Sequence, residues 1–205
     1  MTSLDHLAGK AIPVVRFDAA SDARIAVDWL REGGLTIFEI TATVPNFTAL
    51  IAELAARPDL LIGAGTLLDA ETAAAAIEAG AKFLVSPCFV AEVAEAGARA
   101  ALPVFPGAAT PTEVLNAHRA GAAAVKVFPA KQLGGPGYIS ALRSVFPHIP
   151  LMPTGGITLD DAGDYLRAGA VALGMGGQLV TVADIRAGRR DEVVARAARL
   201  AGLKA

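Results

Sequence analysis

The stretch DAETAAAAIEAGAKFLVS, residues 69–86, contains a helical segment, a helix stop and a short apolar run, in that order. Alanine and glutamate favour a helix, and the glycine at position 80 is typical of the residue that ends one. The apolar run 82–86 begins two residues later. Such a run between helical segments is typical of a parallel strand that helices cover on both faces. The stretch therefore predicts a helix followed at once by a buried strand.

The same unit repeats along the chain. The triplets EAG (78–80), RAG (119–121) and RAG (167–169) each lead directly into an apolar run. Seven helical segments separate the apolar runs, and a further helix is expected at about 189–201. Eight apolar runs are found, at 11–17, 35–40, 60–65, 82–86, 102–105, 123–128, 150–154 and 170–176.

Alternating strands and helices predict a parallel α/β sheet with right-handed crossovers. Eight such units in 205 residues predict a (β/α)8 TIM barrel. We expect one domain over residues 1–205, with a short lead-in helix in the first ten residues. An open doubly wound sheet is the alternative. It normally has fewer strands and a glycine-rich first turn, whereas the first turn here, RFDAASD at 16–22, contains no glycine.

Composition narrows the classes of protein. Hydrophobic residues make up 54% of the chain, but no apolar run reaches the roughly 18 residues of a membrane span. The net charge is −2 and aromatic residues are 5%, and no basic stripe or basic amphipathic helix indicates nucleic acid or a membrane surface. The lone Cys88 excludes an internal disulfide, and the N-terminus lacks the order of a signal peptide. We expect a cytoplasmic protein that acts on a small molecule.

Lys126 stands inside the apolar run AAAVKVFPA, residues 122–130. Strand alternation places it opposite Val125 and Val127, so the amine faces the barrel axis if the valines face the helices. A low-dielectric pocket disfavours a charged amine, and a neutral amine can form a Schiff base with a ketone. The alternatives are an amine that extends to solvent at the strand end or one that pairs with a buried carboxylate.

Glu39 is the second charged residue in a run of buried type, LTIFEI at 35–40. A carboxyl group beside a reactive lysine can shuttle protons during imine formation and enamine protonation. A structural Lys–Glu ion pair is the alternative. The histidines end no strand and form no cluster with ligand spacing, so no metal is expected. The glycine clusters PTGG (153–156) and GMGG (174–177) close the last two strands, where such barrels often bind phosphate through backbone N–H groups.

The ordered motifs FEIT, IGAGT, LVSP, PGAATPTE, VKVFPA, PTGGI and GMGG resemble the 2-keto-3-deoxy-6-phosphogluconate and 4-hydroxy-2-oxoglutarate aldolases, over about residues 10–180. The resemblance implies a Schiff-base, class I aldolase. Such an enzyme splits a phosphorylated keto-deoxy sugar acid, or hydroxy-oxoglutarate, into pyruvate and an aldehyde. It also implies a homotrimer that needs no metal and no cofactor.

The resemblance implies a role for each matching residue. Lys126 looks like the Schiff-base lysine and Glu39 the general acid/base, acting on the C4 hydroxyl through a water. Thr66 looks like a contact to the pyruvate carboxylate. Three residues look like pocket residues that select which face of the substrate reacts: Pro87, Phe128 and Thr154. Four glycines look like the phosphate loops: Gly155, Gly156, Gly176 and Gly177.

Two positions depart from the family pattern. Many members have an arginine where Thr43 stands in EITATVP, and we expect Arg16 at the end of the first strand to supply the missing cation. An arginine also ends that strand in related phosphogalactonate aldolases, so the galactonate acid is an alternative substrate. Many members have a serine at the position of Gly177, and the lost hydroxyl removes about 0.5–1.5 kcal/mol of phosphate binding.

Two other functions remain open from the sequence. A phosphosugar isomerase or epimerase would use the same phosphate loops with Glu39 as its base and Lys126 as an electrostatic helper. A non-catalytic barrel would sense a phosphorylated metabolite and turn nothing over. Trapping of a Schiff base on Lys126 would separate the aldolase from both.

Overall fold

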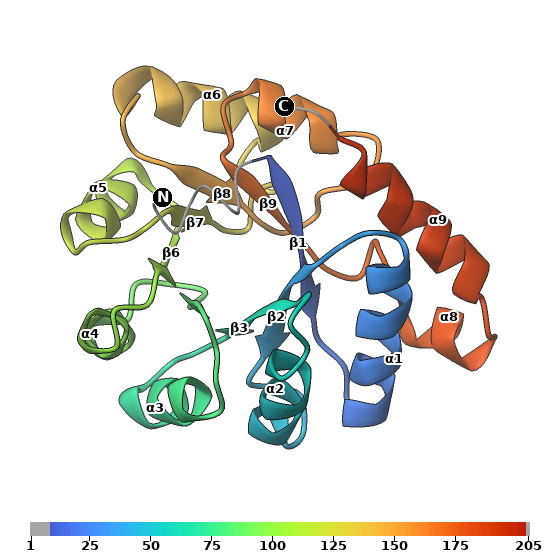
Figure 1. Cartoon of the computed structure of the whole chain (residues 1–205). Coiled ribbons are helices and arrows are strands. Elements are labelled where there is room, and N and C mark those ends of the chain that lie inside the picture. The colour runs from blue at the N-terminus through green and yellow to red at the C-terminus, as the bar shows by residue number, and fades with distance from the viewer. Residues whose placement is uncertain (1–8, 204–205) are drawn as a thin grey trace.

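Strands and helices alternate along residues 9–203, the part of the chain that the computed structural model describes. The strands are β1 (Lys10–Val15), β2 (Ile37–Thr41), β3 (Leu61–Gly65), β4 (Leu84–Val85), β5 (Val104–Phe105), β6 (Gly107–Ala108), β7 (Val125–Val127), β8 (Leu151–Pro153) and β9 (Ala172–Met175). The helices are α1 (Ala20–Glu32), α2 (Phe47–Ala55), α3 (Ala70–Glu78), α4 (Ala91–Arg99), α5 (Pro111–Arg119), α6 (Gly135–Val145), α7 (Ala162–Arg167), α8 (Val182–Arg186) and α9 (Arg190–Ala201). The helices lie around the outside of the strands (Figure 1).

All strand pairs are parallel. They form a curled six-stranded sheet in the order β5-β4-β3-β2-β1-β9 and a three-stranded sheet in the order β6-β7-β8. Backbone hydrogen bonds cross both gaps between the sheets: Val171 donates to Leu151 (2.9 Å) and Ala123 donates to Val104 (3.0 Å). Pro106 separates β5 from β6, because proline has no N–H to give to a strand ladder.

Each of the eight predicted apolar runs contains a strand, and the predicted last helix at about 189–201 is α9. Two details differ from the prediction. A further two-residue strand, β6, follows β5 and belongs to the other sheet, and neither it nor the short helix α8 was expected. Thr181 caps α8 in a reciprocal box with Asp184, a pattern that nucleates a turn locally. Most of the predicted lead-in helix lies outside the described residues, and Lys10 already begins β1.

Buried apolar side chains form two layers. The larger layer joins helix residues to strand residues such as Val125 and Val127. The smaller one lies on the other side of the sheet and consists of Ile12, Ile37, Phe83, Val85, Phe105, Ala124, Met152 and Ala172. Ala124 and Lys126 are two positions apart and so share a strand face. The lysine therefore points to the inner side, as the sequence predicted for a lysine flanked by valines that face helices.

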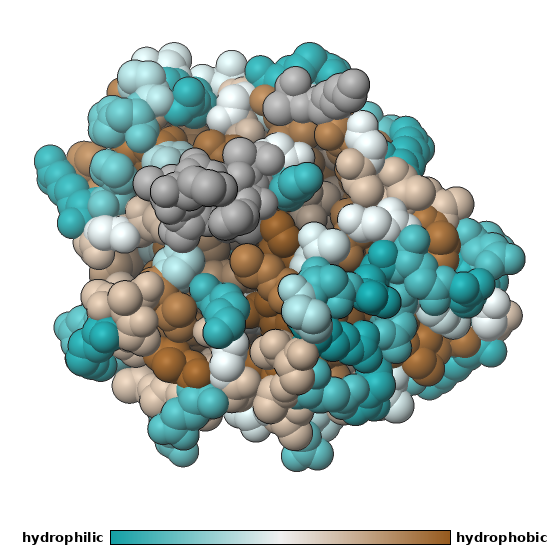
Figure 2. Space-filling model, viewed as in Figure 1, coloured by the Kyte–Doolittle hydropathy of each residue, from teal (hydrophilic) through white to brown (hydrophobic). Residues whose placement is uncertain are grey.

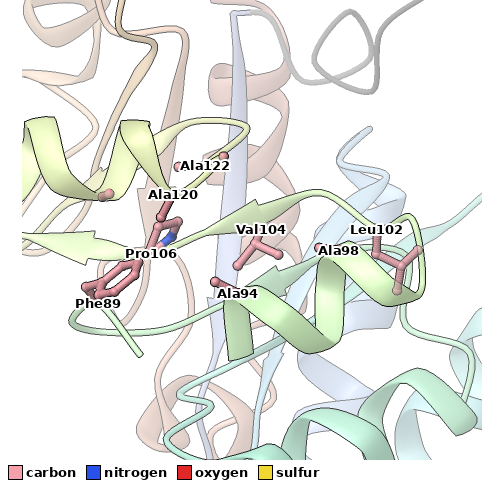
Figure 3. Close-up of a pocket in the computed structure, with 10 residues that line it drawn as sticks. Phe89, Ala94, Ala98, Leu102, Val104, Pro106, Ala120 and Ala122 are labelled. Atoms are coloured by element: carbon pink, nitrogen blue, oxygen red, sulfur yellow. The ribbon is translucent and has the colours of Figure 1, made fainter. Parts of the chain in front are cut away.

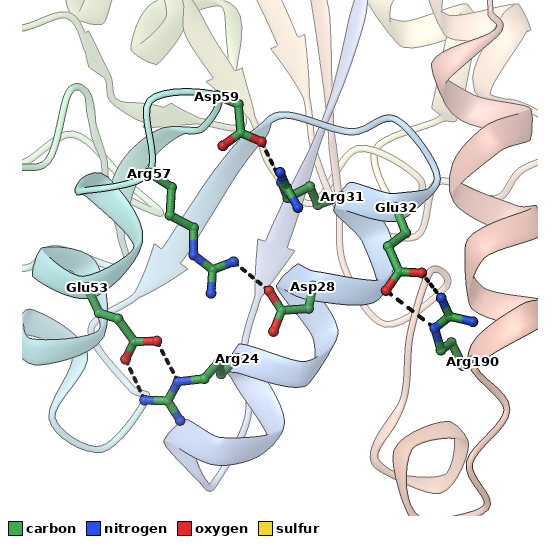
Figure 4. Close-up of polar contacts among 8 residues, drawn as sticks. All are labelled: Arg24, Asp28, Arg31, Glu32, Glu53, Arg57, Asp59 and Arg190. Atoms are coloured by element: carbon green, nitrogen blue, oxygen red, sulfur yellow. Dashed lines mark hydrogen bonds and ion pairs between the residues drawn. The ribbon is translucent and has the colours of Figure 1, made fainter.

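Ion pairs surround α1 on the outside of the molecule (Figure 4). They join α1 to the region of α2 on one side and to α9 on the other. Their side chains are about a third to a half exposed, and ion pairs of this kind contribute little to stability. The pairs are Arg24–Glu53, Arg57–Asp28, Arg31–Asp59 and Arg190–Glu32.

Hydrophilic residues gather on the outer helices on the face shown in Figure 2, and hydrophobic residues lie toward the middle. Within residues 9–203, no helix combines the length and the apolar character that a membrane crossing requires.

Candidate active site

A cavity of about 530 Å³ opens where the strands end. Much of its wall is built from residues within two positions of a strand end: Arg16 after β1, Thr66 after β3 and Pro87 after β4, with Phe128, Thr154 and Gly176 after β7, β8 and β9. Lys126, in the middle of β7, also lines it. Carboxyl ends of parallel strands are where α/β proteins bind ligands. The cavity therefore has the position expected of an active site.

Lys126, which lines this cavity, lies beside Glu39. The Lys126 Nζ lies 3.5 Å from Glu39 Oε1, and the two side chains are 6% and 1% exposed. The contact lacks hydrogen-bond geometry, and Oε1 has no hydrogen-bond partner among the described residues. The same Nζ lies 5.7 Å from the centre of the Phe128 ring, within the range of a cation–π contact. The carboxylate is thus close enough to exchange a proton with a group bound to the amine. No side chain in the described part of the chain forms a hydrogen bond with Oε1.

Gly65 makes room for the Glu39 carboxyl group. A Cβ atom at Gly65 would lie 1.9 Å from Glu39 Oε1 and 2.4 Å from its carboxyl carbon. Real side chains do not approach this closely, so any larger residue on β3 would displace the acid. Only glycine at this position lets β2 and β3 pair while the carboxylate lies over the neighbouring strand. Glu39 itself does not line the cavity, but its carboxyl group lies beside Lys126, which does.

Arg16 is held by hydroxyl groups rather than by an acid. It donates from Nη2 to Thr66 Oγ1 (2.8 Å) and from Nη1 to Thr43 Oγ1 (3.3 Å). Thr43 Oγ1 also lies 2.8 Å from Thr41 Oγ1, which contacts the Val15 carbonyl oxygen (3.2 Å). These are neutral partners, so the guanidinium keeps its charge available for an anion. A planar guanidinium is well suited to a carboxylate.

Thr66 has a left-handed backbone, with φ at +59°. This conformation is an outlier for a β-branched residue and costs of order 1–3 kcal/mol. The hydrogen bond from Arg16 to its hydroxyl (2.8 Å) helps to hold it. Strain of this kind gathers at functional sites, which fits the position of Thr66 on the cavity wall.

Two glycine pairs form one side of the cavity: Gly155–Gly156 and Gly176–Gly177. Gly155 and Gly156 both have left-handed φ angles, +98° and +76°, which glycine adopts at no steric cost. A Cβ at Gly155 would lie 3.1 Å from the Phe128 ring, and one at Gly177 would meet nothing within 4 Å. Backbone N–H groups in such segments can approach an anion closely.

The structure brings most of the sequence-predicted site residues to one cavity. Thr43 is the exception among the substrate-binding predictions: it is exposed, does not line the cavity and contacts it through Arg16. The sequence interpretation did not single out Gly65, Ile157 or Gln178, although the last two line the cavity. Gln178 directly follows the GMGG cluster, so its place in the sequence could have indicated it. Gly65 could not be found in this way, because its importance lies in a contact with another strand.

A second hollow, lined by ten residues, lies at α4 and α5 (Figure 3) and measures about 100 Å³. Its lining carries no titratable side chain and consists of Phe89, Ala94, Ala98, Leu102, Val104, Pro106, Ala117, Ala120, Gly121 and Ala122. None of these side chains could act as an acid, a base or a nucleophile, so this hollow is not a candidate active site. In residues 9–203 no group of three or more His, Cys, Asp or Glu side chains could hold a metal ion.

A family model and a curated relative both place this chain among the same group of enzymes. Residues 5–196 match the family model for KDPG and KHG aldolase. The 2-dehydro-3-deoxy-phosphogluconate aldolase of Pseudomonas aeruginosa is 40% identical over 158 residues, which is 77% of this chain and 72% of that protein.

Solved structures agree with the sequence matches. The 2-keto-3-deoxy-6-phosphogluconate aldolase of Zymomonas mobilis ZM4 with 3-phosphoglycerate has a TM-score of 0.87 at 29% identity, over 98% of this chain and 96% of that chain. The KDPG aldolase of Legionella pneumophila, with pyruvate captured as a covalent carbinolamine intermediate, has a TM-score of 0.87 at 28% identity, over 97% and 96%.

These matches define an enzyme, an aldolase of the lyase class. The chain belongs to the KDPG and KHG aldolase family, as the motifs of its sequence indicated.

Proposed function

We propose that this aldolase cleaves 2-keto-3-deoxy-6-phosphogluconate, or the related 4-hydroxy-2-oxoglutarate, through a Schiff base on Lys126. The products are pyruvate and an aldehyde, glyceraldehyde 3-phosphate or glyoxylate. One observation carries the proposal: an amine and a carboxyl group, both almost fully buried, lie 3.5 Å apart, and the amine lines a cavity. The pyruvate carbinolamine in the Legionella relative supports the same chemistry here.

The chemical steps follow from these two groups. Lys126 first passes a proton to Glu39, and its nitrogen lone pair then attacks the C2 ketone. Glu39 gives that proton to the carbinolamine hydroxyl, which leaves as water, so that a protonated imine and a carboxylate remain. Glu39 takes the proton of the C4 hydroxyl. The C3–C4 bond breaks, its electron pair moves to C3 and the imine nitrogen to form an enamine, and the aldehyde leaves. Glu39 returns the proton to C3, and water hydrolyses the imine to release pyruvate and the free amine.

The remaining residues hold the substrate in this geometry. Arg16 and Thr66 bind the carboxylate of the keto acid, and Arg16 replaces the cation that many family members carry at Thr43. The glycine pairs Gly155–Gly156 and Gly176–Gly177 bind the distal phosphate through backbone N–H groups. Pro87, Phe128 and Thr154 shape the walls around the reacting carbons. Binding energy from the remote phosphate is thereby used to orient the C3–C4 bond.

We also propose that the two sheets form one closed eight-stranded barrel, with β5 and β6 as a single interrupted strand. Hydrogen bonds across both gaps support this closure. The chain then forms one domain over residues 1–205. A homotrimer is proposed from the resemblance to the family, and sedimentation velocity would check it.

Reductive trapping tests the proposed function. The protein is incubated with pyruvate and borohydride, digested and analysed by mass spectrometry. We expect a reduced pyruvoyl adduct on Lys126 and no adduct in the Lys126→Met variant. An adduct on another lysine, or none at all, contradicts the Schiff-base assignment and favours an isomerase or a sensor. Turnover with both phosphorylated C4 epimers and with hydroxy-oxoglutarate then identifies the preferred substrate.

A further inference from the structure

Lys131 lies at the edge of the proposed phosphate loop and has no part in the steps above. It follows the VKVFPA motif on the segment between β7 and α6. Its backbone N–H donates to the Gly155 carbonyl oxygen (3.1 Å), and the Ala130 N–H donates to that of Thr154 (2.8 Å). These bonds extend the pairing of β7 with β8 and hold Lys131 beside the glycine pair.

The stem of the Lys131 side chain packs on Gly156. A Cβ atom at Gly156 would lie 2.7 Å from Lys131 Cβ and 3.0 Å from its Cδ. The ammonium lies two bonds beyond Cδ, about 2.5 Å further. The amine is therefore within reach of an anion bound on the Gly156 backbone, and Gly156 lines the cavity.

The charge of Lys131 is not neutralised locally. The side chain is exposed, and no ion pair or hydrogen bond joins it to another group in residues 9–203. Of the two cations that line the cavity, Lys126 lies beside Glu39, and Arg16 is assigned above to the carboxylate of the keto acid. Lys131 is therefore the cation that borders the glycine pair without a partner in the described part of the chain.

We propose that Lys131 binds the distal phosphate of the substrate and sets the preference for phosphorylated keto acids. This inference rests on the proposed function. A phosphate monoester carries a charge of about −2 near neutral pH, and a flexible lysine is a common point-charge partner for it. Gly177 offers no hydroxyl, and the space beside it is open. Lys131 supplies from the opposite loop the side-chain contact that Gly177 does not provide.

Substrate discrimination tests this role. Lys131→Met keeps a stem that packs on Gly156 and removes the charge, whereas Lys131→Arg keeps the charge. Lys82→Met is the matched control, because Lys82 is an exposed lysine that lines a different hollow before β4. Steady-state kinetics are measured for 2-keto-3-deoxy-6-phosphogluconate and for phosphate-free 4-hydroxy-2-oxoglutarate. Inorganic phosphate is titrated into each variant by calorimetry.

We expect Lys131→Met to raise KM for the phosphorylated acid at least tenfold and to change kcat/KM for the phosphate-free acid less than twofold. Lys131→Arg should recover most of the loss, and Lys82→Met should match the unmutated protein. An equal loss on both substrates, or no loss on either, overturns the proposal. The affinity for inorganic phosphate tests the role of Lys131 even if the protein turns over neither acid. A tenfold loss of phosphate affinity in Lys131→Met supports phosphate binding by Lys131, and an unchanged affinity refutes it. Absent turnover refutes only the proposed function.

Discussion

The buried pair of Lys126 and Glu39 makes a sharp prediction about stability. Three variants form a double-mutant cycle: Glu39→Gln, Lys126→Met and the two together. Both substitutions nearly keep the volume of the original side chain, so cavity effects are small. The cycle measures the interaction free energy between Lys126 and Glu39. The proposed catalytic pair requires this energy to be large.

The expected magnitude follows from the geometry. At 3.5 Å and an effective dielectric constant of about 20, the Coulomb attraction is about 5 kcal/mol. Removing one partner leaves an uncompensated buried charge and should lower the free energy of unfolding by about 3–5 kcal/mol. Removing both replaces the pair with neutral groups, which is often neutral or stabilising by about 1–4 kcal/mol. The double variant should therefore be more stable than either single variant.

Urea unfolding followed by the fluorescence of the single tryptophan, Trp29, measures this cycle at pH 7. Equal m-values across the four proteins allow the midpoints to be compared as free energies. Losses that add to within about 0.5 kcal/mol are typical of independent sites. Such additivity would refute a coupled buried pair, and with it the assignment of Glu39 as the acid that works beside the amine.

Three further outcomes are expected. Gly65→Ala forces Glu39 to move by more than an ångström. Because a displacement of about 1 Å can cost roughly 100-fold in rate, kcat should fall by about that factor. An unchanged kcat would exclude the close approach of Gly65 to the Glu39 carboxyl group. Arg16→Ala removes the cation that donates to Thr66 and should raise KM for pyruvate in the reverse reaction about tenfold, equivalent to about 1.4 kcal/mol. An unchanged KM would mean that groups other than Arg16 bind the pyruvate carboxylate. Burial raises the pKa of Asp184, but its hydrogen bonds to arginine and threonine side chains outweigh this and hold the pKa well below its ordinary value. Its stabilising contribution is therefore present above about pH 4 and lost as the pH falls, so Asp184→Asn should cost about 2 kcal/mol at pH 7, with the difference shrinking in acid; a constant difference down to pH 2 would contradict this.

Local patterns were enough for much of the fold. The eight apolar runs each predicted the place of a strand, and the glycine stops at 80, 121 and 169 marked the helix end before three of them, because a helix end and a buried strand are encoded by neighbouring residues. Lys126 and Glu39 were also visible in the sequence. A charge inside an apolar run is costly unless it has a partner or a function, so each residue stands out within a few positions of its own strand.

Other features depend on residues far apart in the chain and appear only when the strands pair. Gly65 matters because strand pairing lays the Glu39 side chain over it, and neither residue carries a local sign of that contact. Arg16 meets Thr43 and Thr66, 27 and 50 positions away, and Lys131 lies on the glycine pair because β7 is beside β8. The sequence by itself determined the repeating unit and pointed to the two buried charged residues, Lys126 and Glu39, since burial and helix ends are local properties. Only the tertiary structure decided which residues lie beside each cation and which glycine makes room for the acid, since register and strand order set those distances.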